Sequence, residues 1–125
     1  MKKVTEKPLY WIGSSLEDLK KFPEGVKDVM GYSLDVAQRG VKADNAKPLA
    51  NVVKGGRIFE VYDDHKGDTY RAVYTVKFEK AVYVLHAFKK KSKSGIATPK
   101  PDIDTMRARY KKAEEHYAKN FGGKK

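Results

Sequence analysis

Three side chains on two neighbouring strand-like segments have types that suit phosphate chemistry. The stretch YRAVYTVKFEKAVYVLHAFKKKSKS, residues 70–94, combines alternating apolar residues with a run of lysines. Arg71 lies in its first half, and His86 and Lys90 lie in its second half. Arginine binds phosphate through two parallel donors, whereas histidine and lysine transfer protons when their pKa values suit the reaction. These residue types indicate a phosphate-binding site with acid–base groups.

A hairpin with a two-residue turn at residues 79–80 would bring these side chains together. This turn predicts that Arg71 lies opposite Phe88, and that Val73 lies opposite His86. Side chains alternate across a strand, and a one-residue bulge would break the arrangement. The face predicted to hold the site carries Arg71, Val73, Thr75, His86, Phe88 and Lys90. The opposite face, predicted to be core, carries Tyr70, Ala72, Tyr74, Val76, Phe78, Tyr83, Leu85 and Ala87.

The lysine run at residues 89–91 has two interpretations. Lysines at a strand end often only prevent pairing with another strand. Three cationic or titratable groups around the aromatic Phe88 would instead suit an RNA phosphate and a stacked base. We expect Arg71 and Lys90 to face solvent in either case. The spacing alone favours neither interpretation.

The pattern of helical and strand-like segments around these residues predicts an α+β domain. This domain has a mainly antiparallel sheet, two N-terminal helices and a C-terminal helix. Residues 41–56 and 92–101 are predicted loops, residues 63–68 a polar turn, and the tail from about residue 122 is predicted to be loose. The order is β-α-α-β-β-β-α: a strand at 8–12, a helix capped by Ser14 or Ser15, a helix at 23–40, strands at 58–62, 69–78 and 81–89, and a helix capped by Asp102.

The composition limits the classes of function. A formal net charge of +11 over 125 residues favours a polyanionic partner. There is no Cys, and His65, His86 and His116 are scattered, so we expect no metal and no cofactor. The chain begins without the apolar run of a signal peptide and contains no membrane-length apolar stretch, which predicts a cytoplasmic protein that does not enter membranes.

The motifs YRAVY and VYVLHAFKKKSKSGIATPKPDID, in this order of elements, resemble the RelE/ParE superfamily of bacterial toxins and its phage-derived HigB-like branch. The resemblance extends from about residue 9 to residue 117. It implies one toxin domain over residues 1–125, with a ribosome-dependent mRNA endonuclease activity. Cleavage would use the ribose 2′-OH as the nucleophile, without metal. The implied partners are the ribosome, mRNA and a cognate antitoxin protein, and the oligomeric state is left open.

The resemblance also assigns roles to residues. Arg71 and Lys90 would hold and polarise the scissile phosphate, with Lys89 or Lys91 as neighbours. His86 is a further candidate for proton transfer. Glu60, Asp63 and Asp64 stand where related toxins often carry lysines, so the general base is left open. The expected RNA-binding residues are Lys91, Lys93, Lys66, Arg57, Phe88 and His65.

Two other classes of function fit the same residues. A ParE-like chain would poison a DNA topoisomerase, and its expression would break DNA but leave mRNA intact. A non-catalytic nucleic-acid-binding module would use the same basic face, and substitution of Arg71 or Lys90 would then change affinity only. The basic cluster at the position that the nucleases use favours the endonuclease.

Overall fold

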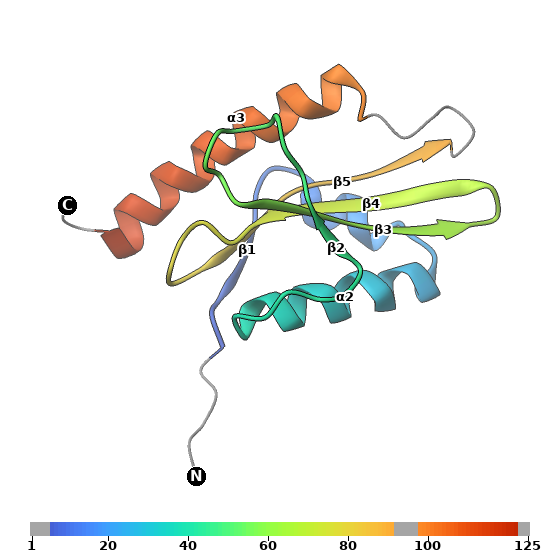
Figure 1. Cartoon of the computed structure of the whole chain (residues 1–125), viewed down its shortest axis with the longest axis horizontal. Coiled ribbons are helices and arrows are strands. Elements are labelled where there is room, and N and C mark those ends of the chain that lie inside the picture. Colours follow the sequence, from blue (N-terminus) through green and yellow to red (C-terminus); the bar gives the residue numbers. More distant parts are fainter. Residues whose placement is uncertain (1–5, 92–97, 123–125) are drawn as a thin grey trace, which may run out of the picture.

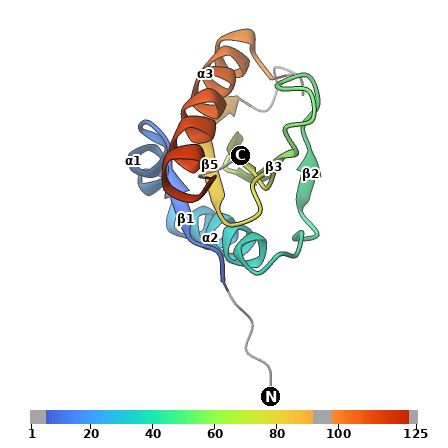
Figure 2. The ribbon, with the colours of Figure 1, turned by 90° about the vertical axis from the view of Figure 1, so that its left-hand side faces the viewer.

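The protein is a five-stranded sheet with helices on both faces, as a computed structural model that describes residues 6–91 and 98–122 shows (Figure 1). Helix α2 covers one face and helix α3 covers the other (Figure 2). None of the described helices combines the length and apolar character needed to cross a membrane. The elements are β1 (Leu9–Trp11), α1 (Ser15–Lys20), α2 (Glu24–Gln38), β2 (Ala46–Pro48), β3 (Ile58–His65), β4 (Asp68–Thr75), β5 (Val82–Lys91), α3 (Lys100–Tyr117) and a π-helical turn (Ala118–Gly122).

The sheet has the order β1-β5-β4-β3-β2. Strands β2 to β5 pair antiparallel, and β1 pairs with β5 in parallel. The predicted α+β class and mainly antiparallel sheet are therefore confirmed. One prediction for this region was wrong, because residues 46–48, expected within a loop, form the short edge strand β2. Pairing with β3 stabilises this segment although its sequence, Ala-Lys-Pro, has weak strand propensity.

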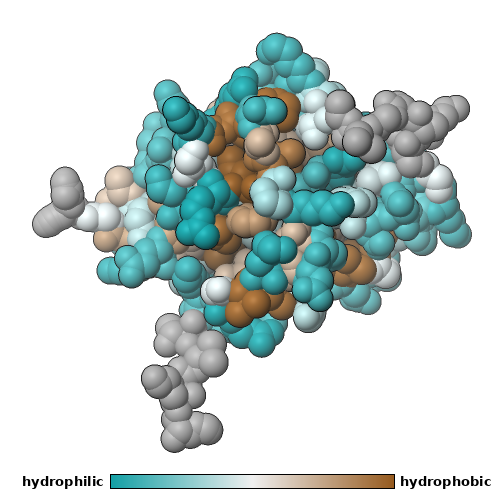
Figure 3. Space-filling model, viewed as in Figure 1, coloured by the Kyte–Doolittle hydropathy of each residue, from teal (hydrophilic) through white to brown (hydrophobic). Residues whose placement is uncertain are grey.

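Two apolar layers hold the helices to the sheet. On one face, Met30 and Leu34 of α2 pack with Tyr74 of β4 and with the side chain of Leu19 from α1. On the other face, Met106 of α3 packs in a second buried cluster on the sheet. Burial of these side chains supplies the main stabilisation of both layers. From the outside, hydrophilic side chains cover most of the face shown in Figure 3, with smaller apolar areas between them.

The hairpin between β3 and β4 is tighter than the predicted turn over residues 63–68. Its strands extend to His65 and begin again at Asp68, and these two residues pair. Lys66 and Gly67 between them have φ values of 51° and 86°. Positive φ at both central residues is the signature of a type I′ turn, which matches the twist of the flanking strands. This turn fixes which residues of β3 lie opposite β4.

The pairing between β4 and β5 confirms the predicted register at the site and corrects it near the turn. Arg71 lies opposite Phe88 and Val73 opposite His86, but Tyr74 pairs with Val84. The register therefore shifts by one residue, and residues 76–81 form the connection in place of a two-residue turn. Because of this bulge, Tyr83 and Leu85 join the layer under α3 rather than the predicted core face with Tyr74.

Two arginines of helix α3 bind the β2–β3 connection, strand β5 and the start of α1. Arg107 donates to the carbonyl oxygens of Val52 and Asn51, at 2.7 and 2.8 Å. Arg109 donates to the carbonyl of Leu85 and to the hydroxyl of Ser14, at 3.0 and 3.2 Å. The helix begins at Lys100 after an N-cap at Pro99, so the prediction that Asp102 caps it was wrong. Asp102 instead lies in the first turn.

Candidate functional site

The confirmed register places the predicted site residues on the side of the sheet that carries α3. Arg71 and Phe88 lie opposite each other, and Lys90 lies opposite Thr69 at the next position along the same face. His86 lies on this side as well, since its ring contacts Asp102 of α3. We call this group, Arg71, His86, Phe88 and Lys90, the sheet-face cluster.

Arg71 is the most constrained member of the cluster. Its guanidinium forms an ion pair with the carboxylate of Glu60 on β3, and the two residues are only 7% and 8% exposed. The expectation that Arg71 faces solvent was therefore wrong. Its Nε has no hydrogen-bond partner in the part of the chain that the structure describes. The ring of Tyr62, which lies opposite Arg71 on β3, covers the guanidinium with its centroid 5.7 Å from Cζ.

Lys90 is buried beside this ion pair, with 9% exposure, so the same expectation was wrong here too. Burial lowers the pKa of Lys90 below its ordinary value, and the nearby charge of Arg71 lowers it further. The carboxylates of Glu60 and Asp102 act in the opposite direction and attract the proton. A lysine whose pKa is lowered gives up its proton more readily than an exposed lysine.

His86 is held from two sides. Its Nε2 lies 2.7 Å from Oδ1 of Asp102, and its ring stacks on Phe88 with the centroids 4.6 Å apart and the planes 22° apart. Asp102 occupies the first turn of α3, where the helix dipole favours a carboxylate. Nδ1 of His86 is buried and has no hydrogen-bond partner among the described residues. This arrangement orients the imidazole and leaves one ring nitrogen for another contact.

The cluster thus combines groups for charge stabilisation with groups for proton transfer. The two carboxylates, from Glu60 and Asp102, bind the arginine and the histidine and so hold them in place. The charges of both carboxylates and of Arg71 act on the pKa of Lys90. Such a set can bind a phosphate and exchange protons with it. Among the described residues, no three His, Asp or Glu side chains gather in a way that would hold a metal ion.

Several predicted site residues lie elsewhere. Lys89 follows the opposite side of β5, where it approaches Asp68 at 3.8 Å and lines a hollow of about 450 Å³ together with Tyr70. His65 also turns to that side, because its ring contacts Tyr70 at a centroid distance of 6.3 Å. The register therefore separates Lys89 and His65 from Arg71.

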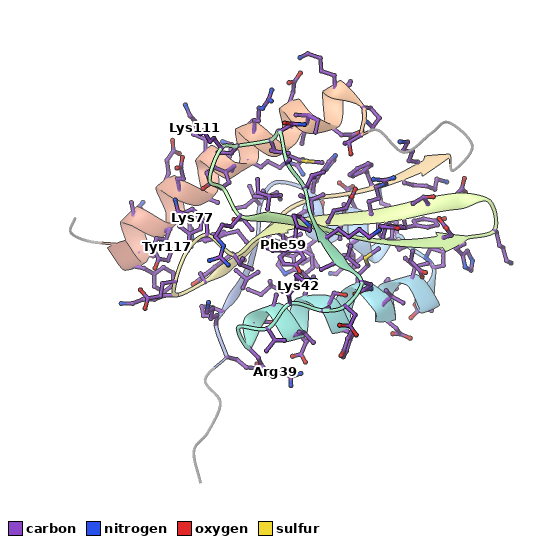
Figure 4. All side chains as sticks on the ribbon, in the orientation of Figure 1. Arg39, Lys42, Phe59, Lys77, Lys111 and Tyr117 are labelled. Atoms are coloured by element: carbon purple, nitrogen blue, oxygen red, sulfur yellow. The ribbon has the colours of Figure 1, made fainter. Side chains whose placement is uncertain are left out.

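The remaining predicted RNA contacts are spread over the molecule. Arg57 precedes β3 at the end remote from the hairpin and lines a hollow of about 210 Å³ with Lys42 and Phe59; Figure 4 labels the latter two. Lys66 is exposed at the hairpin tip. Lys91 ends β5 opposite Asp68. Lys93 lies outside the described residues.

Sequence reasoning missed three side chains that complete the site. Glu60 appeared only as a departure from the lysines of related toxins, Asp102 appeared as a helix cap, and Tyr62 was not considered. The signal for Glu60 and Tyr62 was the Lys66-Gly67 pair, because a type I′ turn there sets Tyr62 opposite Arg71. No local signal places Asp102, since its position depends on how α3 packs.

Comparison with known proteins settles the family. The family model for "Phage derived protein Gp49-like" matches residues 17–111, which is most of the chain. The chain belongs to this Gp49-like family. The match spans all the residues of the sheet-face cluster and its carboxylate partners.

The fold of this Gp49-like protein is similar to that of a solved structure of a mutant E. coli toxin RelE in the free state. The TM-score is 0.53 at 16% sequence identity, and the similarity covers 82% of this chain and 95% of the RelE chain. At this identity the likeness concerns the fold. The predicted RelE-like fold is thereby confirmed. No curated protein sequence matches the chain.

Proposed function

We propose that this Gp49-like protein is the toxin of a toxin–antitoxin pair, and that it cleaves mRNA on the ribosome in the cytoplasm. The RelE fold and the family support a toxin. The single observation that supports cleavage is the buried cluster of Arg71, Lys90 and His86, each with a carboxylate beside it. A buried lysine whose pKa is lowered suits proton transfer better than RNA binding alone.

The proposed reaction uses the ribose 2′-OH as the nucleophile. A base removes the proton of the 2′-OH, the 2′-oxygen attacks the adjacent phosphorus, and the 5′-oxygen leaves with a proton from an acid. The products are a 2′,3′-cyclic phosphate and a 5′-hydroxyl. Arg71 stabilises the negative charge that develops on the phosphate oxygens, because its guanidinium stays protonated and is already oriented by Glu60.

We assign the base to the neutral form of Lys90 and the acid to His86. Glu60 is the alternative base, but its carboxylate is engaged by Arg71. Nε2 of His86 contacts the carboxylate of Asp102. Nδ1 is therefore the atom that delivers the proton, and this buried nitrogen must become accessible when RNA binds. The contact with Asp102 holds the ring in the orientation that this proton transfer needs.

The proposed partners follow from the charge and the fold. A net charge of +11 favours the ribosomal RNA and mRNA that the reaction needs. An antitoxin encoded beside the toxin would silence it by covering the sheet-face cluster or by blocking entry to the ribosome. Acidic segments suit such a partner, because they complement the same positive charge.

Expression in a bacterial host tests the proposal directly. Growth should stop, and primer extension should find new mRNA ends within codons that are being translated. The purified chain should cut an mRNA bound to programmed ribosomes, and the same experiment without ribosomes shows whether they are required. Arrested growth with intact mRNA would overturn the endonuclease, and DNA breaks in those cells would favour the topoisomerase poison instead.

A further inference from the structure

Tyr62 is an exposed aromatic side chain that lies directly against the sheet-face cluster. It is 37% exposed, and only Tyr32 and Val41 accompany it as exposed large apolar side chains in the described part of the protein. Those two lie on α2 and just after it, whereas Tyr62 lies on β3 opposite Arg71. A single exposed tyrosine needs no explanation by itself, but this one lies next to the proposed phosphate-binding group.

The ring of Tyr62 contacts cations from two strands. The guanidinium of Arg71 lies 5.7 Å from its centroid. Nζ of Lys47, on the edge strand β2, donates to the Tyr62 hydroxyl at 3.0 Å. Nζ of Lys47 is also 5.1 Å from the ring centroid, a distance that follows from its position at the hydroxyl. Hydrogen bonding to Tyr62, ahead of the charge of Glu60, raises the pKa of Lys47.

We propose that Tyr62 is a stacking platform for an unpaired nucleobase of the mRNA, and that Lys47 binds the phosphate of the same nucleotide. This inference rests on the proposed function and adds a substrate-positioning pair to it. One side of the ring is occupied by Arg71, and its exposed part is left for a base. Stacking of bases on exposed aromatic rings beside cations is the usual way in which proteins bind single-stranded RNA.

The geometry says what the pair does for cleavage. The base on Tyr62 belongs to a nucleotide adjacent to the phosphate that Arg71 binds, because the ring and the guanidinium are in contact. Stacking there aligns the ribose with the phosphorus, and alignment of reacting groups is worth a large share of a cleavage barrier. Tyr62 and Lys47 are therefore positioning residues, and they transfer no proton.

Single abasic nucleotides in the mRNA test the stack. Ribosomes with an empty A site are programmed with mRNAs in which one nucleotide at a time lacks its base, and single-turnover cleavage is measured at increasing toxin concentration. For the wild type, one abasic position should weaken half-saturation about tenfold, as expected when one stacked base is lost. Tyr62→Leu should show the same weakening of half-saturation with intact mRNA. The abasic position should then weaken half-saturation of this variant no further. Tyr62→Phe should behave like the wild type at every position.

The controls separate the stack from the proposed function. Tyr32→Leu removes a tyrosine on α2 that is even more exposed than Tyr62, and it should leave the profile unchanged. The stacking platform is overturned if the wild type cleaves but its profile has no sensitive position. It is also overturned if the abasic position weakens half-saturation of Tyr62→Leu a further tenfold. In both cases the proposed endonuclease activity is unaffected. If the wild type cleaves no mRNA, the proposed function itself is overturned. A wild-type profile without a sensitive position overturns the platform even if Tyr62→Leu does not fold.

Discussion

Arg71 on β4 and Glu60 on β3 form a buried ion pair at the centre of the candidate site. They are not direct cross-strand partners, because Arg71 lies opposite Tyr62 and Glu60 lies opposite Val73. The pair is therefore diagonal, and it ties β3 to β4, the strand that carries the proposed phosphate-binding group. A buried pair of this kind has different consequences for stability and for activity.

Removal of one partner should destabilise the protein strongly. Glu60→Ala leaves the guanidinium buried without its carboxylate, so we expect the free energy of unfolding to fall by about 3–5 kcal/mol. Glu60→Leu combined with Arg71→Met should recover most of this loss but have no cleavage activity. Denaturant unfolding measures both. Glu24→Ala, which breaks the exposed pair of Glu24 with Lys27, is the control and should change the value by less than about 1 kcal/mol.

Arg71 and Lys90 should act together in cleavage. Arg71→Ala and Lys90→Ala should each lose about 2.7–4 kcal/mol of transition-state stabilisation, by analogy with the removal of one oxyanion donor. The double variant should lose less than the sum, because the two groups serve one charge. Single-turnover cleavage per folded molecule is the measurement. Lys111→Ala, at an exposed position on α3 about two and a half turns beyond Asp102, should cleave like the wild type; Figure 4 labels this lysine. Additive losses would show that the two residues act independently.

Stability should depend on pH through Lys90. The folded chain holds the Lys90 proton less tightly than the unfolded chain, because burial and then Arg71 lower its pKa below 10.5. Between the lowered pKa and about 10.5 the unfolded chain binds more protons, so this group makes the free energy of unfolding rise with pH. Lys90→Met should abolish the rise and should be more stable than the wild type at about pH 7.

Denaturant titrations between about pH 7 and pH 10 measure this dependence. Burial raises the pKa values of Tyr74 and Tyr83 to about 12. Their contribution has the opposite sign, but it begins only above about pH 10, where tyrosine in the unfolded chain loses its proton. Lys89→Met, at the exposed neighbouring lysine, should keep the rise. A slope that survives in Lys90→Met would have to come from another group.

Asp102 should link the stability of the first turn of α3 to the orientation of the His86 ring. Asp102→Asn keeps the shape of the side chain but removes the charge that orients the imidazole, so cleavage should fall while the fold is retained. Asp102→Ala should also lose about 1–3 kcal/mol of stability, because a buried ring nitrogen then lacks its partner. Hydrogen exchange should show faster opening of residues 100–104 in the alanine variant. Unchanged exchange and cleavage in both variants would remove Asp102 from the site.

The hairpin tip offers a test of RNA contact that is separate from folding. Lys66 adopts a φ of 51°, which is unfavourable for lysine but readily adopted by asparagine. Lys66→Asn should therefore raise the free energy of unfolding by up to about 1 kcal/mol. If Lys66 contacts RNA, the same variant should cleave more slowly despite its greater stability. Gly67→Ala is the opposite control, because the φ of 86° at this position disfavours a side chain.

The sequence was sufficient to pair Arg71 with Phe88 but insufficient to find the turn. Alternation of side chains over residues 70–90 determines which residues share a face near the site. The predicted pairing is wrong by one residue at Thr75, which pairs with Tyr83. It is correct at Arg71, because the bulge at Leu85 lies between the site and the turn. Bulges have no reliable local signature in a single sequence, which is why the exchange of Tyr83 and Leu85 between faces was not foreseen.

The partners of the catalytic candidates could not be predicted for a different reason. Whether a charged strand residue is solvated or buried depends on neighbours that are remote in sequence. Glu60 reaches Arg71 only when the register of the first hairpin is known, and Asp102 reaches His86 only when α3 is packed. Alternation along β5 did distinguish Lys90 from Lys89, but it could not show that Lys90 is desolvated.

The parallel pairing of β1 with β5 has a consequence for the order of folding during synthesis. Leu9 emerges from the ribosome early but pairs with Val82, which is made much later. The local hairpins of β3, β4 and β5 can close before this contact forms, since short loops close at lower entropic cost. Asp102 is made later still, so His86 acquires its partner only after α3 has been synthesised. The nascent chain would thus lack a complete sheet-face cluster until nearly all of it has been synthesised.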